Sequence, residues 1–297
     1  MKHLIIGASG QIGGYLFRTL KNAGEDVEGT YHTTCISGLQ KLDIRQEARV
    51  QELIAATSPD IVYLPAAQSN VEYCEVSADD AHRTNIHGLR HVVRAVNDIG
   101  ATIVFFSSDY IFDGKAGPYR EDDAPHPINV YGWQKLAGEH YIALHAADYL
   151  VVRTTVVYGW ERQGKNFVCH LLRRLRSGSM IHVPTDQVGN PTYAPNLADA
   201  VAELAIEGIQ GVYHIAGPDR ISRYEFACEA ARAFGLDSTL IWPTLTVNTR
   251  QRALRPLEAG MVVDKAVARL TTPLVGYQEG LKIMAFQSTI EDQYAKG

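Results

Sequence analysis

The chain has 297 residues, of which 46% are hydrophobic and 21% charged, with a formal net charge of −5 at pH 7. This composition is typical of a soluble globular protein, and it gives no electrostatic reason to expect nucleic-acid binding. No apolar run is long enough to cross a membrane. The four cysteines are far apart and lack C-x-x-C spacing, which argues against a disulfide framework or a zinc site. We therefore expect a cytoplasmic protein without a metal site.

The first half of the chain alternates strand and helix patterns. The strands are continuous β-branched or aromatic runs, as expected of a parallel sheet that helices cover on both faces. This alternation predicts a doubly wound α/β domain of the Rossmann class, in which ligands bind at the carboxyl ends of the strands. We expect strands over 3–7, 26–32, 61–67, 101–108 and 148–159, and helices over 11–24, 46–58, 78–100 and 130–146.

After Gly159 the alternation loosens. Helices are expected over 166–178, 195–208 and 222–235, strands over 180–186 and 211–217, and loops over 236–260. The last of these helices begins at Ser222, a residue type that favours the N-cap. We expect residues 1–159 to form a dinucleotide-binding domain to which some later segments return. Residues 160–297 are expected to form mainly a smaller, interleaved substrate-binding lobe.

A glycine-rich turn, G-x-x-G-x-x-G, follows the first predicted strand and opens the first helix. Glycines allow a tight turn, a close approach of backbone to a pyrophosphate, and close packing of helix on strand. The helix N-terminus adds free N–H groups and the positive end of the helix dipole. A glycine-rich turn without a ligand is the alternative, but the position after the first strand favours a cofactor. The residues predicted to bind a dinucleotide here are Gly7, Ser9, Gly10, Gln11, Ile12 and Gly13.

The end of the second predicted strand is the usual place for an acid that selects NAD through the ribose 2′-hydroxyl. The segment 29–34 reads GTYHTT and has no acid. His32 and its neighbours could accept a 2′-phosphate instead, so we favour NADP(H), with NAD(H) as the alternative. The alternative for His32 itself is an ordinary loop residue.

Three side chains with complementary chemistry are expected at the carboxyl edge of the sheet. Ser108 ends a predicted strand, and Tyr131 and Lys135 stand one turn apart on the following helix. A ketone becomes an alcohol when hydride adds at carbon and a proton reaches oxygen. Tyr131 can supply that proton, and a nearby ammonium lowers the ordinary pKa of a phenol, about 10. Ser108 can polarise the carbonyl. Taken singly, the Tyr and the Lys are also compatible with a half-buried ring and a solvated amine.

The glycine spacing and the Ser and Tyr-x-x-x-Lys pattern resemble the extended short-chain dehydrogenase/reductases. Within that superfamily, nearly the whole chain resembles the dTDP-4-dehydrorhamnose reductases, through segments such as 107–139, 186–198 and 255–264. Members of that family reduce the 4-keto group of a nucleotide-linked 6-deoxy sugar with NAD(P)H, in the last step of dTDP-rhamnose synthesis. The resemblance implies the same substrate class and reaction here.

The resemblance also implies roles for particular residues, with Ser108 standing where the family usually has Thr. For the cofactor they are Asp43, Ile44, Ala66, Ala67, Tyr131 and Lys135. For the substrate they are Ser108, Asp109, Tyr110, Trp160, Asn166, Phe167, Asp186 and Gln187. Asp186 and Gln187 have the alternative of structural hydrogen bonds at a strand end. Arg173, Arg174 and Arg176 could attract a substrate diphosphate or form a solvated helix face. Gln68 departs from the family, which commonly has Tyr there.

Two rival functions stay open at this point. The regulatory β-subunit of methionine adenosyltransferase resembles the same family, and there the fold binds NADP(H) and serves a partner protein. A reductase of a different ketosugar is the other rival, because pocket shape decides the substrate. The sugar-nucleotide 4,6-dehydratases fit poorly, because Tyr110 stands where they have a catalytic Glu. For the oligomeric state, a symmetric homodimer is the prior expectation.

Overall fold

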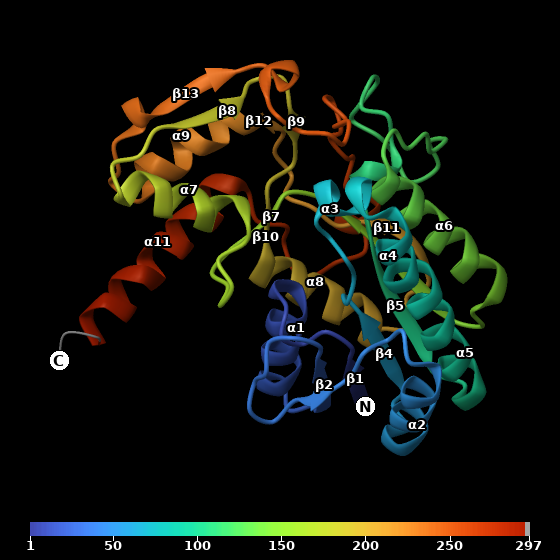
Figure 1. The fold of residues 1–297 in the computed structure, drawn as a ribbon. Coiled ribbons are helices and arrows are strands. Elements are labelled where there is room, and N and C mark those ends of the chain that lie inside the picture. Colours follow the sequence, from blue (N-terminus) through green and yellow to red (C-terminus); the bar gives the residue numbers. More distant parts are fainter. Residues whose placement is uncertain (295–297) are drawn as a thin grey trace.

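The computed structural model describes residues 1–294, with side chains as far as residue 287. Its centre is a seven-stranded sheet in the order β11-β6-β5-β4-β1-β2-β3, in which every pair of neighbours is parallel (Figure 1). This confirms the predicted doubly wound class. The strands are β1 (Lys2–Ile5), β2 (Asp26–Tyr31), β3 (Gln40–Lys41), β4 (Ile61–Leu64), β5 (Thr102–Ser108), β6 (Tyr149–Thr154) and β11 (Gly211–His214).

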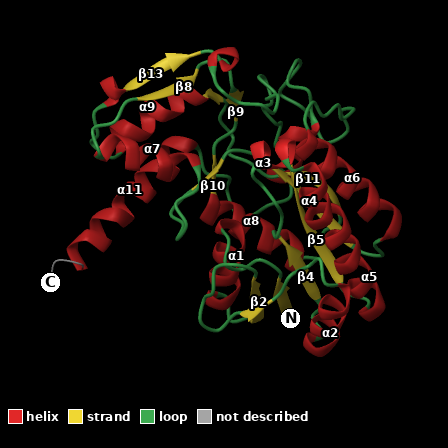
Figure 2. Cartoon of the chain, viewed as in Figure 1, coloured by secondary structure: helices red, strands yellow, loops and turns green. Residues whose placement is uncertain are grey.

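Helices cover both faces of the sheet (Figure 2), and the strand sequences explain why. Successive residues of a strand point to opposite faces, so Leu4 and Ile5, both fully buried, enter different cores. Helices α1 (Gln11–Asn22) and α8 (Ala194–Ile206) pack on one face. The other face carries α2 (Glu47–Thr57), α5 (Leu89–Ile99) and α6 (Val130–His145). Because both faces of these strands are buried under helices, each strand needs apolar residues along its whole length.

The single long helix predicted over 78–100 is interrupted. It consists of α4 (Ala78–His82), a π-helical turn over Arg83–Gly88, and α5. The extra residue in a π-turn changes the direction of the side chains that follow it. In this turn Asn85 is buried, and its amide donates to the side-chain oxygen of Gln134 on α6 at 2.7 Å. A short helix, α3 (Val71–Val76), precedes this segment.

The strand predicted over 148–159 is likewise two strands, β6 and β7 (Val157–Tyr158). Between them Val156 adopts a φ of 42°, a left-handed conformation that is costly for a β-branched residue. The bend moves the chain out of the main sheet, and β7 pairs instead with β10 (Thr192–Tyr193). Val156 itself lines the cavity described below, so the strained bend lies at the site.

The second lobe holds its own core, built around α7 (Phe167–Arg176), α9 (Arg223–Ala233) and α11 (Tyr277–Tyr294). Two small pairs of strands border it: β8 (Ile181–Pro184) with β13 (Ile241–Thr244), and β9 (Val188–Gly189) with β12 (Ile221–Ser222). One more short helix, α10 (Asp264–Val267), follows. The predicted lobe range 160–297 also contains 295–297, which lie outside the described residues.

Two sequence expectations in this lobe have definite outcomes. The N-cap prediction at Ser222 is confirmed by a capping box. The Ser222 hydroxyl accepts from the backbone N–H of Glu225, and the Glu225 carboxylate accepts from the backbone N–H of Ser222. The region 236–260 is not only loop, because β13 lies within it. β13 has only four residues, one of them Pro243, and it pairs with a single neighbour. Its sequence therefore shows no alternating pattern from which a strand could be predicted. Within residues 1–294, no helix combines the length and apolar character needed to span a bilayer.

Candidate active site

The turn between β1 and α1 has the backbone that a phosphate cradle needs. Gly7 adopts a φ of 105°, and a Cβ at Gly13 would lie 2.3 Å from the carbonyl oxygen of Gly7, so only glycine lets helix and strand pack this closely. Within the described chain, no side chain caps α1 and no acid lies in its first turn. Its N–H groups and positive dipole end are therefore open to an anion. This arrangement fits the pyrophosphate of a dinucleotide.

Neighbouring segments close around this turn. Ser9, Gln11 and Ile12 are half-buried, and the Gln11 amide donates to the Gly159 carbonyl oxygen at 3.3 Å, at the start of the second lobe. From the loop after β4, the Cβ of Ala66 lies 3.0 Å from where a Cβ at Gly7 would be. The structure thus brings the predicted turn next to the predicted loop at 66–67. Their contacts with a cofactor stay a prediction.

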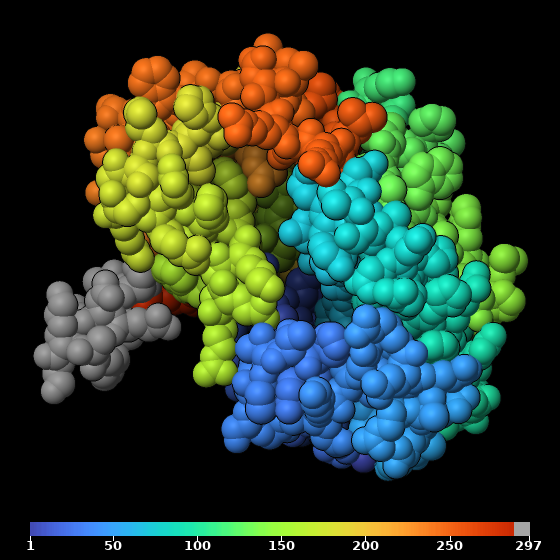
Figure 3. Space-filling view, viewed as in Figure 1, coloured from blue at the N-terminus to red at the C-terminus, as the bar shows by residue number. Residues whose placement is uncertain are grey.

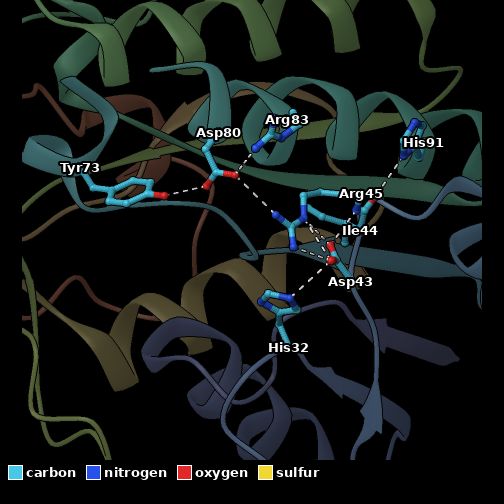
Figure 4. Close-up of polar contacts among 8 residues, drawn as sticks. All are labelled: His32, Asp43, Ile44, Arg45, Tyr73, Asp80, Arg83 and His91. Atoms are coloured by element: carbon cyan, nitrogen blue, oxygen red, sulfur yellow. Dashed lines mark hydrogen bonds and ion pairs between the residues drawn. The ribbon is translucent and has the colours of Figure 1, made fainter. Parts of the chain in front are cut away.

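At the far end of the same edge, His32 and Asp43 lie together (Figure 4), with 3.5 Å between Nε2 and Oδ2. Asp43 also accepts from the guanidinium of Arg45 at 2.7 and 2.9 Å, and these hydrogen bonds lower the pKa of Asp43. Arg45 reaches Asp80 on α4 at 3.7 Å. Ile44 is buried beside them. The sequence predicted a cofactor role for His32, Asp43 and Ile44, but it did not single out Arg45.

The three predicted catalytic side chains come from β5 and α6. Ser108 is the last residue of β5, while Tyr131 and Lys135 occupy the first two turns of α6. Asn129 caps this helix by accepting from the backbone of Gly132 at 2.8 Å, which fixes where both side chains point. The Lys135 ammonium is buried, donates to the Phe106 carbonyl at 2.7 Å, and lies 5.7 Å from the centre of the Tyr131 ring. Burial lowers the pKa of Lys135 to about 8.

The pKa of Tyr131 differs from the sequence expectation. Burial raises it well above its ordinary value, and the nearby carboxyl of Asp109 raises it further. A hydrogen bond with Ser108 acts in the opposite direction but is the weaker effect. The expected net lowering of the Tyr131 pKa is therefore wrong for this structure, because desolvation, the largest effect, raises it. Tyr131 is held in its protonated form, the form that a proton donor needs.

Behind Ser108 lies a buried carboxyl. Asp109 accepts hydrogen bonds from Ser108 Oγ at 2.9 Å and from Thr155 Oγ1 at 2.6 Å. Its side chain is almost fully enclosed, and this burial raises the pKa of Asp109 to about 6. The ring of Tyr110, the next residue, meets the ring of Tyr131 edge-on, with 5.7 Å between centroids. Asp109 and Tyr110 thus join the three predicted catalytic residues at one point.

A cavity of about 220 Å³ opens from this point between the sheet domain and the second lobe. The space-filling view is hollowed in the same place, between the orange and yellow-green segments and the cyan ones (Figure 3). Four of the residues predicted to bind substrate line the cavity: Asp109, Tyr110, Phe167 and Gln187. It therefore gathers residues from β5, α7 and the segment before β9.

Trp160, Asn166 and Asp186, which do not line the cavity, and also Gln187, which does, make hydrogen bonds within the second lobe and its borders. The Trp160 indole N–H donates to the Met284 carbonyl at 2.9 Å, and its ring meets Phe234 edge-on. Asn166 is the N-cap of α7 and donates to the Gly159 carbonyl at 2.8 Å. Asp186 accepts from the backbone and hydroxyl of Thr246. Gln187 also donates to Thr246, at 3.0 Å. Their contacts with a substrate stay predictions, and the structural alternative given for Asp186 and Gln187 is what the hydrogen bonds support.

Sequence reasoning missed most of the apolar lining of the cavity and two of its polar side chains, Thr155 and Arg223. Thr155 follows β6, and Arg223 is the first residue of α9, so neither belongs to a motif with catalytic spacing. The capping box at Ser222 was readable and places Arg223 at a helix start. The sequence does not show, however, that this helix start lies at the cavity. By contrast, Arg173 and Arg176 line a separate hollow on α7 with Trp160.

Comparison with known proteins places these features in context. The sequence profile of the family described as RmlD substrate binding domain matches residues 1–290. The spore coat polysaccharide biosynthesis protein SpsK of Bacillus subtilis is 36% identical, over 81% of this chain and 82% of its own. The dTDP-4-dehydrorhamnose reductase of Escherichia coli is 31% identical, over 96% of this chain and 97% of its own.

Solved structures agree with these relatives. The dTDP-4-dehydrorhamnose reductase of Bacillus anthracis, solved in complex with NADP, superposes with a TM-score of 0.89 at 29% identity and covers 96% of this chain and 99% of its own. The β-subunit of methionine adenosyltransferase 2 from Xenopus laevis is also similar, at 29% identity over 94% of this chain and 86% of its own.

Proposed function

Because the chain belongs to the RmlD substrate binding domain family, we propose that it is an NAD(P)H-dependent reductase of the 4-keto group of a nucleotide-activated deoxysugar. The observation that carries the proposal is the meeting of Ser108, Tyr131 and Lys135 at the end of β5, beside the cavity and on the same sheet edge as the glycine turn. Reductases of dTDP-4-dehydrorhamnose among its relatives, aligned over nearly the whole chain, support the same reaction class.

NADP(H) is the favoured cofactor and NAD(H) the alternative. The glycine turn offers backbone N–H groups for the pyrophosphate, while His32 and Arg45 lie at the adenosine end without an acid at the end of β2. A relative solved with NADP supports this preference. When bound, the reduced nicotinamide supplies the hydride that adds to the keto carbon.

Side chains of the protein then polarise and protonate the keto oxygen. Tyr131, protonated at neutral pH, donates its phenolic proton to that oxygen as the alcohol forms. Ser108, at the end of the same strand edge, can turn its hydroxyl from Asp109 to the keto oxygen and polarise the carbonyl. After transfer, the Lys135 ammonium beneath the ring stabilises the phenolate until solvent returns the proton. Lys135 is itself fixed by its hydrogen bond to the Phe106 carbonyl.

The experiment that tests this function measures NADPH and NADH oxidation with dTDP-4-dehydro-6-deoxyglucose, with a 3,5-epimerase present to supply the epimerised ketone. We expect rapid oxidation and a preference for NADPH. Failure with this ketone but turnover of another nucleotide ketosugar would keep the reaction class and change the substrate. Tight NADPH binding without oxidation of any ketosugar would instead favour the regulatory role, which copurification with a synthetase would then test.

We further propose that the enzyme acts in the cytoplasm as a homodimer. Each of its four cysteines is a free thiol, which suits a reducing compartment. Helix α6 exposes Trp133 at 58% and Leu144 at 79%, and the eleven-residue spacing puts both on one helix face. Light scattering after size exclusion should give a dimer for the native chain and a monomer for Leu144→Glu. A native monomer would refute the dimer.

A further inference from the structure

Arg223 enters the cavity from a rigid position. It is the first residue of α9, whose capping box fixes the helix start, and its backbone N–H donates to the Gln187 carbonyl at 2.8 Å. Its guanidinium stacks over the ring of Phe167 on α7, 4.4 Å from the centroid. Two elements of the second lobe, α7 and α9, therefore hold this guanidinium at the cavity, which both Arg223 and Phe167 line.

The guanidinium of Arg223 has donors to spare. Among residues 1–287, whose side chains are described, no hydrogen bond or ion pair engages it, although this group carries five N–H donors. Burial lowers its pKa, and the neighbouring Arg255 lowers it further, yet an arginine stays charged at any physiological pH. The side chain is half-buried, and guanidinium donors without a protein acceptor in a cavity wall can bind an anion.

The nearby acids are already committed. The carboxylate of Asp109 receives hydrogen bonds from two hydroxyls. Glu72 on α3 pairs with Nη2 of Arg255 at 2.7 Å and also accepts from the backbone of Arg252. At neutral pH the carboxylates of Asp109 and Glu72 balance the charges of Arg223 and Arg255, but within the described residues neither carboxylate accepts a hydrogen bond from the Arg223 guanidinium. Its N–H donors are therefore open to a ligand in the cavity.

Arg255 supplies a second set of donors. Its side chain is only 9% exposed, and its Nη1 is buried without a hydrogen-bond partner in the described structure. The guanidinium lies 5.8 Å from the ring centre of Tyr110. Tyr110 in turn meets the ring of Tyr131 edge-on and lines the cavity together with Arg223. Tyr110 thus connects the arginines with the proton donor.

We propose that Arg223, with Nη1 of Arg255, binds the diphosphate of the nucleotide-activated sugar, and that Arg223 is a specificity-determining residue for this substrate class. This inference rests on the proposed function and deepens it. It places the diphosphate site at Arg223 and not at the arginines of α7, because Arg173 and Arg176 line a different hollow. Planar guanidinium groups suit diphosphate oxygens, which they bind in pairs of parallel hydrogen bonds.

The test compares Arg223→Met with Arg232→Met, a matched control on the same helix whose arginine is 74% exposed and paired with Glu229. Binding of dTDP and of thymidine is measured by calorimetry at saturating NADP⁺, so that the glycine turn is occupied. We expect Arg223→Met to weaken dTDP binding about 10- to 100-fold and to leave thymidine unchanged. Arg223→Lys should recover part of the loss, and Arg232→Met should behave as the native protein.

Turnover separates this inference from the proposed function. Arg223→Met should raise KM for the nucleotide sugar by a similar factor, with kcat within a few-fold of native, because the arginine lies away from the reacting carbon. Unchanged dTDP affinity in Arg223→Met would overturn the inference even if the native enzyme reduces the sugar. A native protein that binds no dTDP would overturn it as well. Native NADP⁺ affinity and thermal unfolding in the variant would show that the fold is intact.

Discussion

The hydroxyl of Ser108 donates its hydrogen bond to the carboxylate of Asp109, at 2.9 Å, and not toward the cavity. Thr155 donates to the other carboxylate oxygen at 2.6 Å. With its proton engaged in this way, the Ser108 oxygen can only accept, and it accepts from the backbone N–H of Tyr110 at 3.3 Å. The buried carboxyl therefore decides which way the serine is oriented while the site awaits a ketone.

Removing the phenolic hydroxyl should abolish most turnover. In Tyr131→Phe we expect kcat to fall by roughly 10²–10⁴, the range for loss of general-acid help, while NADPH affinity stays near native. The control is Tyr141→Phe, the same change on the same helix, where the ring packs on His145 away from the cavity. Full turnover in Tyr131→Phe would refute the assignment of the proton donor.

The buried amine should set an alkaline limit on activity. The pKa of Lys135 is lowered to about 8, so the side chain is cationic below that pH and loses its charge as pH rises through it. We expect kcat/KM for the nucleotide sugar to fall above about pH 8. In Lys135→Met, kcat/KM should be low at every pH and should not fall further above pH 8. An alkaline limb at the same pH in Lys135→Met would assign the titration to another group.

The carboxyl of Asp109 should make folding stability depend on pH. Its folded pKa, about 6, is raised above the ordinary 3.8, so between these values the folded state binds more protons than the unfolded state. Stability is then lost as pH rises through this window, by about 1 kcal/mol between pH 5 and 7. Asp109→Asn should lack this component. Denaturant unfolding of both proteins at pH 5 and 7 measures it, and parallel changes would contradict the raised pKa.

Packing at the glycine turn should be intolerant of a single methyl group. A Cβ at Gly13 would lie 2.3 Å from the Gly7 carbonyl oxygen, whereas one at Gly14 would lie 3.4 Å from its nearest neighbour. Gly13→Ala must push α1 off β1 and distort the cradle. We expect NADPH affinity to drop more than tenfold, by fluorescence titration, while Gly14→Ala stays near native. Equal affinities for the two variants would remove this turn from the cofactor site.

The features that sequence reasoning predicted share one property: they are local in sequence. The glycine turn is a run of seven residues, and Tyr131 and Lys135 are one helical turn apart, so spacing alone places them together. Ser108 joins them because parallel strands end at a common edge. Arg223 and Thr155 reach the cavity from distant segments, and only the packing of the second lobe shows that they face it.

Two other outcomes show what a sequence does not contain. Asn166 was assigned to the substrate, yet an Asn before an apolar helical run is also an N-cap signature, and that local role is the one its hydrogen bonds support. The pKa of Tyr131 depends on how much water reaches the phenol. Residue spacing predicts that a Lys lies near Tyr131, but it does not predict how deeply the phenol is buried. Desolvation is the largest effect on the pKa of Tyr131.

The outermost strand of the central sheet, β11, has a consequence for synthesis on the ribosome. β6 pairs with β5 on one edge, but its other edge stays open until residues 211–214 have emerged. The core over α1 is closed by α8, which is also made late. A nascent chain ending near residue 159 would display an unpaired strand edge and an uncovered apolar face, both prone to aggregation. The nucleotide-binding half therefore depends on the later half to finish folding, and a fragment cut at that boundary should be recovered as insoluble material.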